Sequence, residues 1–401
     1  MSEQLAIDGG QPTRTEPFPS WPVFDDREEK ALLEVLHSAR WGIGGSKGEA
    51  FARKFAEFQG ARFGIPVPNG TSALELSLRA LGVRSGDEVI TSPYTFVATA
   101  SPILWLGAKP VFVDIEWDSF NIDPAKIEAA ITPRTKAIIP VHLGGRPANM
   151  DGVVAVAKKH NLPVLEDACQ AWGSSWRGQG VGGIGSMGAF SFQSSKNINA
   201  GEGGMVLTND SDLYELAWSL HNVGRSRTGD PHHQDILGGN MRMTEWAAAV
   251  LLVQLERLPE HTEIRQNNAR YLGEALSEIE GLSPLAQDDR ITSNGYHLFR
   301  IRYDAPAFGG HTKDEFVTAL RAEGITPCGP GYVVSLAESP AIRQAMAERF
   351  GADSAPDIAN YPVTKRASTE GMWLSQTALL GSRQDMDSIV AAIQKIHRAW
   401  G

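Results

Sequence analysis

Short, uniformly apolar runs alternate with helical patterns through the first 255 residues of this 401-residue chain. The runs are rich in β-branched residues and lack polar alternation, which is typical of strands covered on both faces. They occupy residues 88–91, 110–113, 137–141, 162–165, 188–192 and 205–208, with helical patterns at 71–81, 124–131 and 150–160. This alternation predicts an α/β fold with a mostly parallel central sheet flanked by helices.

The C-terminal part has a different pattern. A strong helix is predicted over residues 244–258, with Thr244 as its N-cap and Pro259 as a break or kink, and a second helical pattern covers 260–279. Beyond residue 294 the pattern is α+β, with a strand at 296–303 and a terminal helix at 384–400. We therefore predict a large domain of residues 1–258 and a smaller α+β domain of residues 259–401. The first ~20 residues have few helix or strand signals and are predicted to form an extended arm that wraps over a neighbour.

Composition excludes several classes of protein. The net charge is −10 and no basic tract is present, which argues against a nucleic-acid partner. No apolar run approaches the ~18 residues that a membrane span needs, and the N-terminus lacks a signal-peptide pattern, so a cytoplasmic location is predicted. The two cysteines, Cys169 and Cys328, are far apart, which predicts neither a disulfide framework nor a metal site.

Residues 180–185, with the sequence GVGGIG, match the dinucleotide-binding pattern G-x-G-x-x-G. That function requires a strand before the glycines and a helix after them. Here a strand-like run follows instead. The sequence therefore predicts a flexible turn and no dinucleotide site.

Three separated segments carry the candidate chemistry. Gly70, Thr71 and Ser72 open a helix, where N–H groups and the helix dipole favour an anion, although a plain N-cap is the simpler explanation. Glu166 and Asp167 end an apolar strand; alternation places them on opposite faces, so at most one enters a site, and a turn cap is the alternative.

The third segment contains Lys196, which follows another apolar run, with Ser191 five residues before it. Alone, this lysine has the properties of a solvated surface residue. An anion site, a buried carboxylate and a lysine together are the set that pyridoxal phosphate requires, for its phosphate, its ring nitrogen and its Schiff base. Such a lysine works as a neutral amine, so its pKa must be lowered by burial or nearby positive charge.

The chain resembles the DegT/DnrJ/EryC1/StrS aminotransferases, fold-type I enzymes that aminate keto-sugars and cyclitols. Seven segments carry the resemblance in order: 69–83, 88–100, 110–124, 141–151, 164–176, 191–206 and 239–255. The resemblance implies pyridoxal 5'-phosphate as cofactor and a homodimer with shared active sites. Cys169 and Trp172 depart from the family, which more often has alanine and histidine there, and they put the fit of the substrate in doubt.

The resemblance also implies roles for individual residues. Lys196 would carry the Schiff base and move the substrate proton, and Asp167 would pair with the ring nitrogen. Gly70, Thr71 and Ser191 would hold the phosphate, with Ser72 beside them. Gln170 would bond near the ring hydroxyl, Phe96 would stack on the ring, and Asn240 would reach the phosphate in the other subunit. Phe96 as a core residue and Asn240 as a turn residue are the alternatives.

The predicted reaction is a ping-pong transfer of an amino group from glutamine or glutamate to a keto-cyclitol or keto-sugar. Residues 142–146, with the sequence HLGGR, resemble the branches that act on scyllo-inosose or make 3-amino-5-hydroxybenzoate. Arg242 is a weak candidate for the donor carboxylate, and the loop 41–45 is predicted to meet the substrate. A nucleotide-sugar aminotransferase is the second hypothesis. A non-catalytic relative that retains the fold is the third.

Overall fold

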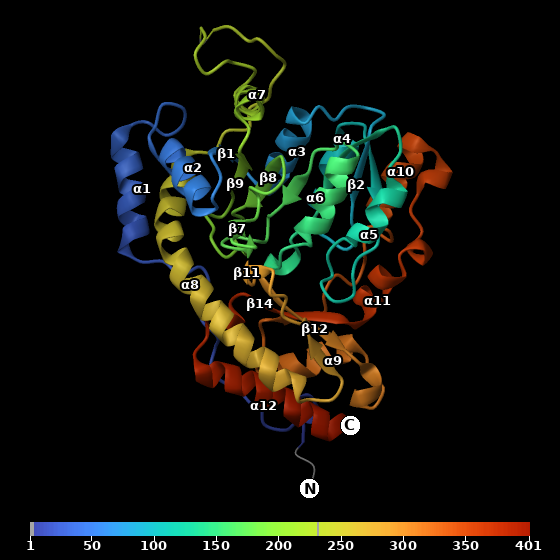
Figure 1. The fold of residues 1–401 in the computed structure, drawn as a ribbon. Helices are drawn as coiled ribbons and strands as arrows, with labels where there is room; N and C mark the ends of the chain where they lie inside the picture. Colours follow the sequence, from blue (N-terminus) through green and yellow to red (C-terminus); the bar gives the residue numbers. More distant parts are fainter. Residues whose placement is uncertain (1–3, 231) are drawn as a thin grey trace.

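A central sheet built by the first half of the chain organises the computed structural model, which describes residues 4–230 and 232–401 (Figure 1). Four of its strands follow the order β1-β9-β8-β5. Isolated bridges from Val164 to Ile138 and from Asp167 to Val141 join them to a second group, in which β4, β2 and β3 follow in that order. Only β9, within this sheet of the described chain, runs antiparallel to both neighbours. The strands are β1 (Phe63–Val67), β2 (Glu88–Thr91), β3 (Lys109–Phe112), β4 (Thr135–Ile139), β5 (Leu165–Asp167), β8 (Met187–Ser191) and β9 (Gly204–Thr208).

Helices cover both faces of this sheet, which explains why its strands are apolar throughout. Val206 packs with α3 and α7 on one face, and its neighbours Met205 and Leu207 pack with α2 and α8 on the other. A third cluster joins β2 and β4 to α5 and α6. The helices of this half are α1 (Asp26–Ser38), α2 (Lys47–Phe58), α3 (Gly70–Ala80), α4 (Ser101–Trp105), α5 (Pro124–Ile127), α6 (Met150–Lys159) and α7 (Ser211–His221).

The predicted α/β class is confirmed, and most predicted strands are shifted by one or two residues at most. The run 162–165 differs more, because β5 begins only at Leu165 and Val164 forms an isolated bridge. Strand β1 was not predicted as a strand. A small separate sheet, β6 (Ser175–Trp176), β7 (Gln179–Gly180) and β11 (Ile291–Ser293), links the two halves of the chain.

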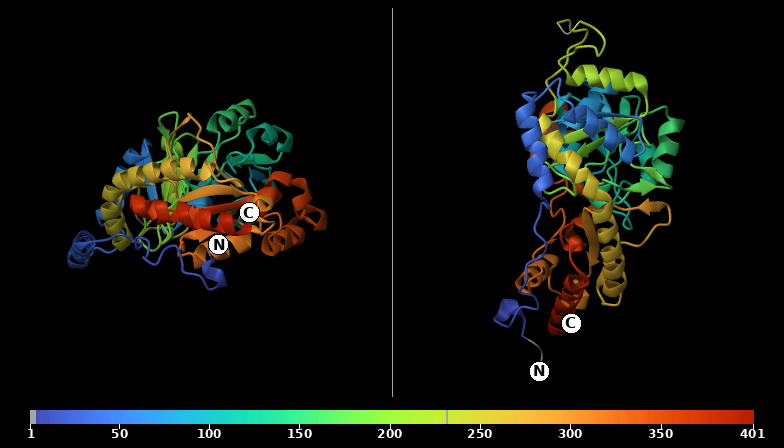
Figure 2. Two further views of the ribbon diagram at one scale, coloured as in Figure 1. Left: turned by 90° about the horizontal axis from the view of Figure 1, so that it is seen from below. Right: turned by 90° about the vertical axis from the view of Figure 1, so that its left-hand side faces the viewer.

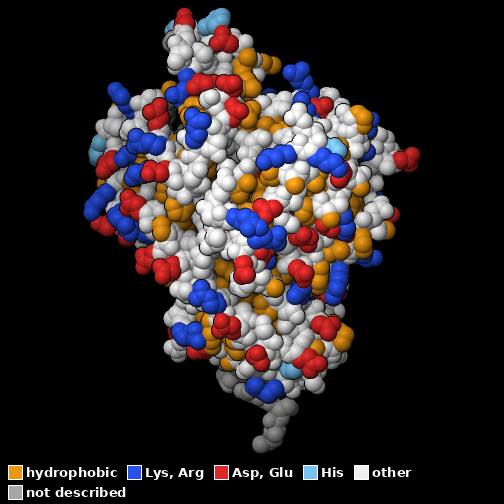
Figure 3. All heavy atoms as spheres, in the orientation of Figure 1, with side chains coloured by type: hydrophobic (Ala, Val, Ile, Leu, Met, Phe, Trp, Pro, Cys, Tyr) orange, Lys and Arg blue, Asp and Glu red, His pale blue; other side chains and the backbone are white. Residues whose placement is uncertain are grey.

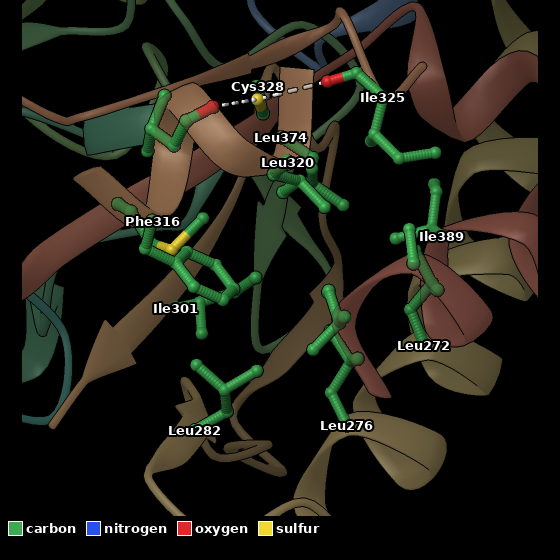
Figure 4. Packing of buried hydrophobic residues seen from close by; sticks show 14 of the residues in the cluster. Leu272, Leu276, Leu282, Ile301, Phe316, Leu320, Ile325, Cys328, Leu374 and Ile389 are labelled. Atoms are coloured by element: carbon green, nitrogen blue, oxygen red, sulfur yellow. Dashed lines mark hydrogen bonds between the residues drawn. The ribbon is translucent and has the colours of Figure 1, made fainter. Parts of the chain in front are cut away.

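The C-terminal half forms an antiparallel sheet of order β10-β12-β14-β13, as the α+β pattern predicted. Figure 4 shows its core, in which side chains from α8 such as Leu272 meet Ile301, Phe316, Leu374 and Ile389. The strands are β10 (Leu282–Pro284), β12 (Leu298–Tyr303), β13 (Cys328–Gly329) and β14 (Gly371–Ser375). The helices are α9 (Lys313–Ala322), α10 (Pro340–Phe350), α11 (Pro362–Glu370) and α12 (Arg383–Trp400).

One long helix, α8 (Glu245–Ser277), runs from the first half into the second (Figure 1). Thr244 caps it as predicted, accepting a hydrogen bond from the N–H of Ala247. Of the break or kink predicted at Pro259, the break is wrong, because the helix continues through the proline. Packing against α1 and α2 on one side and the C-terminal sheet on the other outweighs the lost hydrogen bond. The boundary between residues 258 and 259 thus falls inside a helix, and the division into domains stays a prediction.

The N-terminal arm packs against the C-terminal half of its own chain, where Figure 2 shows the two side by side. Its first element is a short 3-10 helix, η1 (Ala6–Asp8). The buried carboxylate of Glu323 accepts hydrogen bonds from the N–H groups of Ala6 and Thr13, from the Thr13 hydroxyl and from Nζ of Lys395. The arm is therefore held by specific polar contacts.

None of the helices in the described residues is long and apolar enough to cross a bilayer. On the face drawn in Figure 3, basic and acidic side chains are interspersed. Both cysteines are free thiols.

The contacts of Glu323 predict its contribution to stability. Burial opposes its charged form, but the hydrogen bonds from Ala6, Thr13 and Lys395 outweigh burial and lower its pKa. Glu323→Ala should reduce the free energy of unfolding by about 3–5 kcal/mol, because the buried charge of Lys395 loses its carboxylate partner and keeps only the carbonyl of Gln11 among the described residues. Since the folded pKa is lowered, the contribution of Glu323 is lost as pH falls through that pKa.

Chemical denaturation of the wild-type protein and the variant at neutral and acidic pH measures both effects. Glu348→Ala is the control, because Glu348 is exposed and its carboxylate accepts a hydrogen bond from Gln344 on the same helix; it should change stability by less than about 0.5 kcal/mol. Equal losses in the two variants would contradict the prediction.

Candidate active site

Except for Asn240, the predicted cofactor residues lie around the place where β5 and β8 end beside the first turn of α3. These strands are parallel neighbours, with Asp167 opposite Ala189, so their carboxyl ends lie together. A Cβ atom on Gly70 would lie 2.7 Å from Cβ of Ser191 and 2.9 Å from Sγ of Cys169. The fold therefore brings together the three segments that the sequence singled out. Only glycine fits at position 70.

The first turn of α3 offers donors to an anion. Asn69 caps the helix, and its Oδ1 accepts a hydrogen bond of 2.8 Å from the N–H of Ser72. A helix provides no internal partner for the N–H groups of Gly70 and Thr71. Ser72 can therefore contribute only its hydroxyl, while Gly70 and Thr71 can contribute backbone donors beside the hydroxyl of Ser191.

The adjacent carboxylates of Glu166 and Asp167 point to different surroundings, as alternation predicted. Glu166 is fully buried and accepts hydrogen bonds from the N–H groups of Gly182, Ile184 and Gly185 at 2.6–2.8 Å. Its Oε2 also lies 2.9 Å from Nε2 of His142. Nδ1 of that ring accepts from the N–H of Ala148, so Nε2 carries the proton toward Glu166. Glu166 is a structural residue.

These bonds explain the glycine-rich pattern at residues 180–185. Its N–H groups bind a carboxylate of the protein's own sheet, and β8 follows it where a dinucleotide site needs a helix. Gly182 has a φ of +85°, in the left-handed region that favours glycine. The predicted flexible turn is in fact a turn fixed by three hydrogen bonds.

Asp167 faces the proposed cofactor side. Its Oδ2 accepts a hydrogen bond of 2.8 Å from the hydroxyl of Thr99, and its Oδ1 accepts one of 3.2 Å from the N–H of Cys169. Thr95 lies 2.9 Å from Thr99 and continues the chain of hydroxyls. Thr99 and Thr95 were missed by sequence reasoning, because isolated threonines in an apolar segment give no signal of a carboxylate partner.

Lys196 lies in the turn after β8 and is half-buried. Burial lowers the pKa of its amine below the ordinary value of 10.5, while Cys169 and Asp167 act in the opposite direction. Burial also raises the pKa of the Cys169 thiol well above its usual range, so this side chain is a neutral neighbour. The lysine thus has the shift toward the neutral amine that the chemistry requires.

Gln170 connects the site to the C-terminal half. Its Oε1 accepts a hydrogen bond of 2.7 Å from the N–H of Gly144, and its Nε2 donates to the hydroxyl of Tyr332 at 3.3 Å. Burial raises the pKa of Tyr332 to about 12. Tyr332 was not predicted; it lies 162 residues from Gln170, and no local pattern indicates their contact.

Phe96 and Trp172 have contrasting environments. Phe96 is 57% exposed, which rules out the core alternative. It is the N-cap of the short helix η2 (Val97–Thr99), whose Thr99 binds Asp167. Trp172 is completely buried and packs edge-on against His297, and its Nε1 has no partner among the described residues.

Asn240 and Arg242 lie in a different place. Asn240 is exposed and pairs with Asn222, to which Arg242 donates a hydrogen bond of 3.1 Å. Arg242 lines a cavity of about 650 Å³ together with residues 42–45 of the predicted substrate loop. None of the predicted cofactor residues lines this cavity within the described chain. Within one chain, Arg242 and residues 42–45 therefore line a different site from the predicted cofactor residues around Lys196.

The residues around Lys196 fit pyridoxal phosphate. The N–H groups of Gly70 and Thr71 in the first turn of α3 can bind a phosphate. Glycine at position 70 lets this turn pack closely against Ser191, whose hydroxyl can bind the same phosphate. Asp167 retains acceptor capacity for a protonated ring nitrogen, and the amine of Lys196 is shifted toward its neutral form. The fit comes from separate elements of the fold rather than from one motif.

Comparison with known proteins gives similarity over nearly the whole chain. The family model described as "DegT/DnrJ/EryC1/StrS aminotransferase family" matches residues 22–394. A protein of Streptoalloteichus tenebrarius, provisionally named L-glutamine:3-amino-2,3-dideoxy-scyllo-inosose aminotransferase, is 41% identical, and the match covers 99% of each chain.

A second protein of that organism, L-glutamine:2-deoxy-scyllo-inosose aminotransferase, is 37% identical over 100% of this chain and 99% of its own length. Among solved structures, 3-amino-5-hydroxybenzoic acid synthase is similar with a TM-score of 0.88 and 33% identity, covering 96% of this chain and 99% of the synthase.

The two adjacent carboxylates predict a contrast in stability. Glu166→Gln should lower the free energy of unfolding by about 3 kcal/mol, because an amide group then faces N–H donors that need an acceptor. Asp167→Asn makes the same change one residue later, where a rotatable hydroxyl is the main partner, and should cost less than about 1 kcal/mol. Denaturant titration of both variants measures the difference, and a larger loss for Asp167→Asn would show that Glu166 does not hold the turn.

The hydroxyl of Thr99 predicts a contrast in activity. Thr99→Val keeps the shape of the side chain and removes the donor to Asp167, and should lower kcat by about tenfold with little change in thermal stability, because a hydrogen bond to a charged group is lost. Thr95→Val is the matched control, since the Thr95 hydroxyl bonds to Thr99 and not directly to Asp167 among the described residues, and should lower kcat by less than about threefold. Steady-state kinetics measure kcat of both variants. Equal losses of kcat would contradict a specific role of the Thr99 hydroxyl in holding Asp167.

Proposed function

This chain belongs to the DegT/DnrJ/EryC1/StrS aminotransferase family, and we propose that it moves the amino group of L-glutamine to the ketone of an inosose-type cyclitol. The enzyme is an aminotransferase, and its family uses pyridoxal phosphate. The observation that carries the proposal is Lys196, an amine with a lowered pKa beside the buried carboxylate of Asp167. Both sit at strand ends where α/β sheets bind ligands.

The choice of substrates rests on the relatives. The proteins at 41% and 37% identity are both named as L-glutamine aminotransferases of deoxy-scyllo-inososes. The segment 142–146 resembles the branches of the family that act on scyllo-inosose or make 3-amino-5-hydroxybenzoate, which is consistent with this choice. We therefore propose L-glutamine as donor and a deoxy-scyllo-inosose, with or without an amino substituent, as acceptor. The structural similarity to 3-amino-5-hydroxybenzoic acid synthase supports a second candidate, formation of an aminated aromatic acid.

Bound pyridoxal phosphate supplies a ring that accepts electrons from the carbon at which the amino group is exchanged. In our proposal the N–H groups of Gly70 and Thr71 and the hydroxyls of Ser72 and Ser191 bind its phosphate, and the exposed ring of Phe96 covers one face. Gln170 is placed near the ring hydroxyl, with its orientation set by Gly144 and Tyr332.

Proton movements are assigned to two residues. The Asp167 carboxylate holds a proton on the ring nitrogen, and Thr99 and the N–H of Cys169 keep that carboxylate in place. Nζ of Lys196 accepts and returns the proton of the reacting carbon, a step that needs the neutral amine. Because burial lowers the pKa of Lys196, the rate of the donor half-reaction should rise with pH and level off below 10.5.

A homodimer with shared active sites is the proposed assembly. Asn240, Arg242 and the loop 42–45 lie away from Lys196 in one chain, and Asn240 is exposed. Leu237, on the same loop as Asn240, is 92% exposed. In the proposed dimer this loop covers the partner, so Asn240 reaches the phosphate of the other cofactor. A location in the cytoplasm stays a prediction.

The proposed function predicts both the attached residue and the substrates. Borohydride reduction of the holoenzyme should leave a pyridoxyl group on the peptide that contains Lys196. Lys196→Ala should lower kcat by about 10³-fold or more, because the proton-transfer group is removed. Lys159→Ala is the control; Lys159 is exposed and paired with Glu128, and its loss should leave kcat unchanged.

Acceptors are compared with amino-labelled L-glutamine and mass spectrometry of the products. The two deoxy-scyllo-inososes should gain the label, whereas a nucleotide-linked 4-keto sugar should not. If only the nucleotide sugar gained the label, the acceptor would be a nucleotide-linked keto sugar and the proposed cyclitol acceptor would be wrong. A pyridoxyl group found elsewhere would overturn the role of Lys196, and cofactor binding without any half-reaction would select a non-catalytic relative.

A further inference from the structure

The residue after Lys196 ties the lysine turn to the C-terminal half of the chain. Asn197 is 2% exposed. Its Nδ2 donates a hydrogen bond of 2.7 Å to the carbonyl of Gly295, and its Oδ1 lies 3.1 Å from Nδ1 of His297. Both partners stand just before β12, so the position of the lysine turn depends on this distant segment.

The amide of Asn197 determines the state of the histidine ring. Because Nδ2 is used as a donor to Gly295, Oδ1 is the atom that faces His297, and an oxygen can only accept. Nδ1 of His297 therefore carries a proton. In the neutral ring Nε2 then carries none and is an acceptor.

The surroundings keep His297 uncharged. The ring is 8% exposed and packs edge-on against Trp172. Burial, followed by the positive charges of Lys196 and Arg265, lowers the pKa of His297 well below its usual range. Arg265 is itself completely buried, and burial lowers its pKa to about 9. The charged or titratable groups that face this region are thus Lys196, Arg265 and, from the other side of the lysine, Asp167 and Cys169.

The segment that carries His297 has little freedom to move. A Cβ on Gly145 would lie 2.8 Å from the N atom of Tyr296 and 3.0 Å from that of His297. Ser174 accepts a hydrogen bond from the N–H of Gly295 and donates one to the carbonyl of Gly145. Asn197 is therefore attached to a rigid support rather than to a mobile loop.

We propose that Asn197 and His297 are positioning residues for Lys196, which hold its turn in place and put an uncharged ring beside its amine. The proposal rests on the proposed function in assigning the chemistry to Lys196. A fixed backbone at Asn197 limits the volume that the long lysine side chain can sample, and near-attack geometry is sensitive to shifts of about 1 Å. A neutral neighbour shields one side of Lys196 from water without adding a charge that changes with pH.

The test measures the amine of Lys196 without cofactor. Reductive methylation of the full-length apoprotein over a range of pH, followed by peptide mass spectrometry, gives the midpoint for Lys196. His297→Phe keeps a ring but removes the donor to Asn197, and should raise the midpoint by about one pH unit as water enters the turn. His297→Asn places an amide donor near the position of Nδ1 and should restore most of the wild-type midpoint.

Asn197→Asp is the second variant and covers the case in which His297→Phe does not fold. A carboxylate at position 197 favours the protonated form of Lys196, and of His297 as well, and should also raise the midpoint. His221→Phe is the matched control: His221 is another buried histidine, on α7, with a pKa that burial lowers to about 4. It should leave the midpoint of Lys196 unchanged.

Unchanged midpoints in His297→Phe and Asn197→Asp would overturn the proposal, and so would an equal shift in His221→Phe. In the holoenzyme, His297→Phe should lower kcat about tenfold with a smaller change in the KM of the donor. If the midpoints shift as expected but the wild-type holoenzyme performs no half-reaction with L-glutamine, the positioning role stands and the proposed function falls.

Discussion

The buried carboxylate of Glu166 is the contact on which the site depends. Glu166 lies in the middle of β5, accepts hydrogen bonds from three N–H groups of the glycine-rich turn 180–185, and contacts the imidazole of His142, which follows β4. An unpaired carboxylate in this position would be costly, so the turn and the histidine must fold around it together. That arrangement fixes the direction of β5. Its next residue, Asp167, is then presented on the opposite side, beside Thr99 and the lysine turn.

Much of this architecture was predictable from local sequence. Uniformly apolar runs separated by helical patterns indicate a sheet covered on both faces, and strand ends with polar residues indicate where ligands bind. The separation of Glu166 from Asp167 follows from alternation alone. Continuity of α8 through Pro259 did not follow, because the packing of α1, α2 and the C-terminal core outweighs the proline, and that packing is not visible in a local pattern.

The missed site residues have a common physical reason. Thr99, Tyr332 and His297 act through partners that lie 68, 162 and 100 residues away, and a single polar residue in an apolar segment gives no indication of such a partner. The glycine-rich turn shows the opposite case. Its local pattern was correctly separated from a dinucleotide site, but its binding to Glu166 could be seen only once the strand and the turn were placed together.

The N-terminal arm has a consequence for how this enzyme is handled in the laboratory. Ala6 and Thr13 are anchored by Glu323, and further along the arm Nε1 of Trp21 donates a hydrogen bond to the carbonyl of Ser194, two residues before Lys196. The arm therefore runs from the C-terminal half to the lysine turn. A truncation intended to remove a tail without secondary structure would detach both ends of this connection. Affinity tags and surface immobilisation are better attached at Gly401, which is exposed.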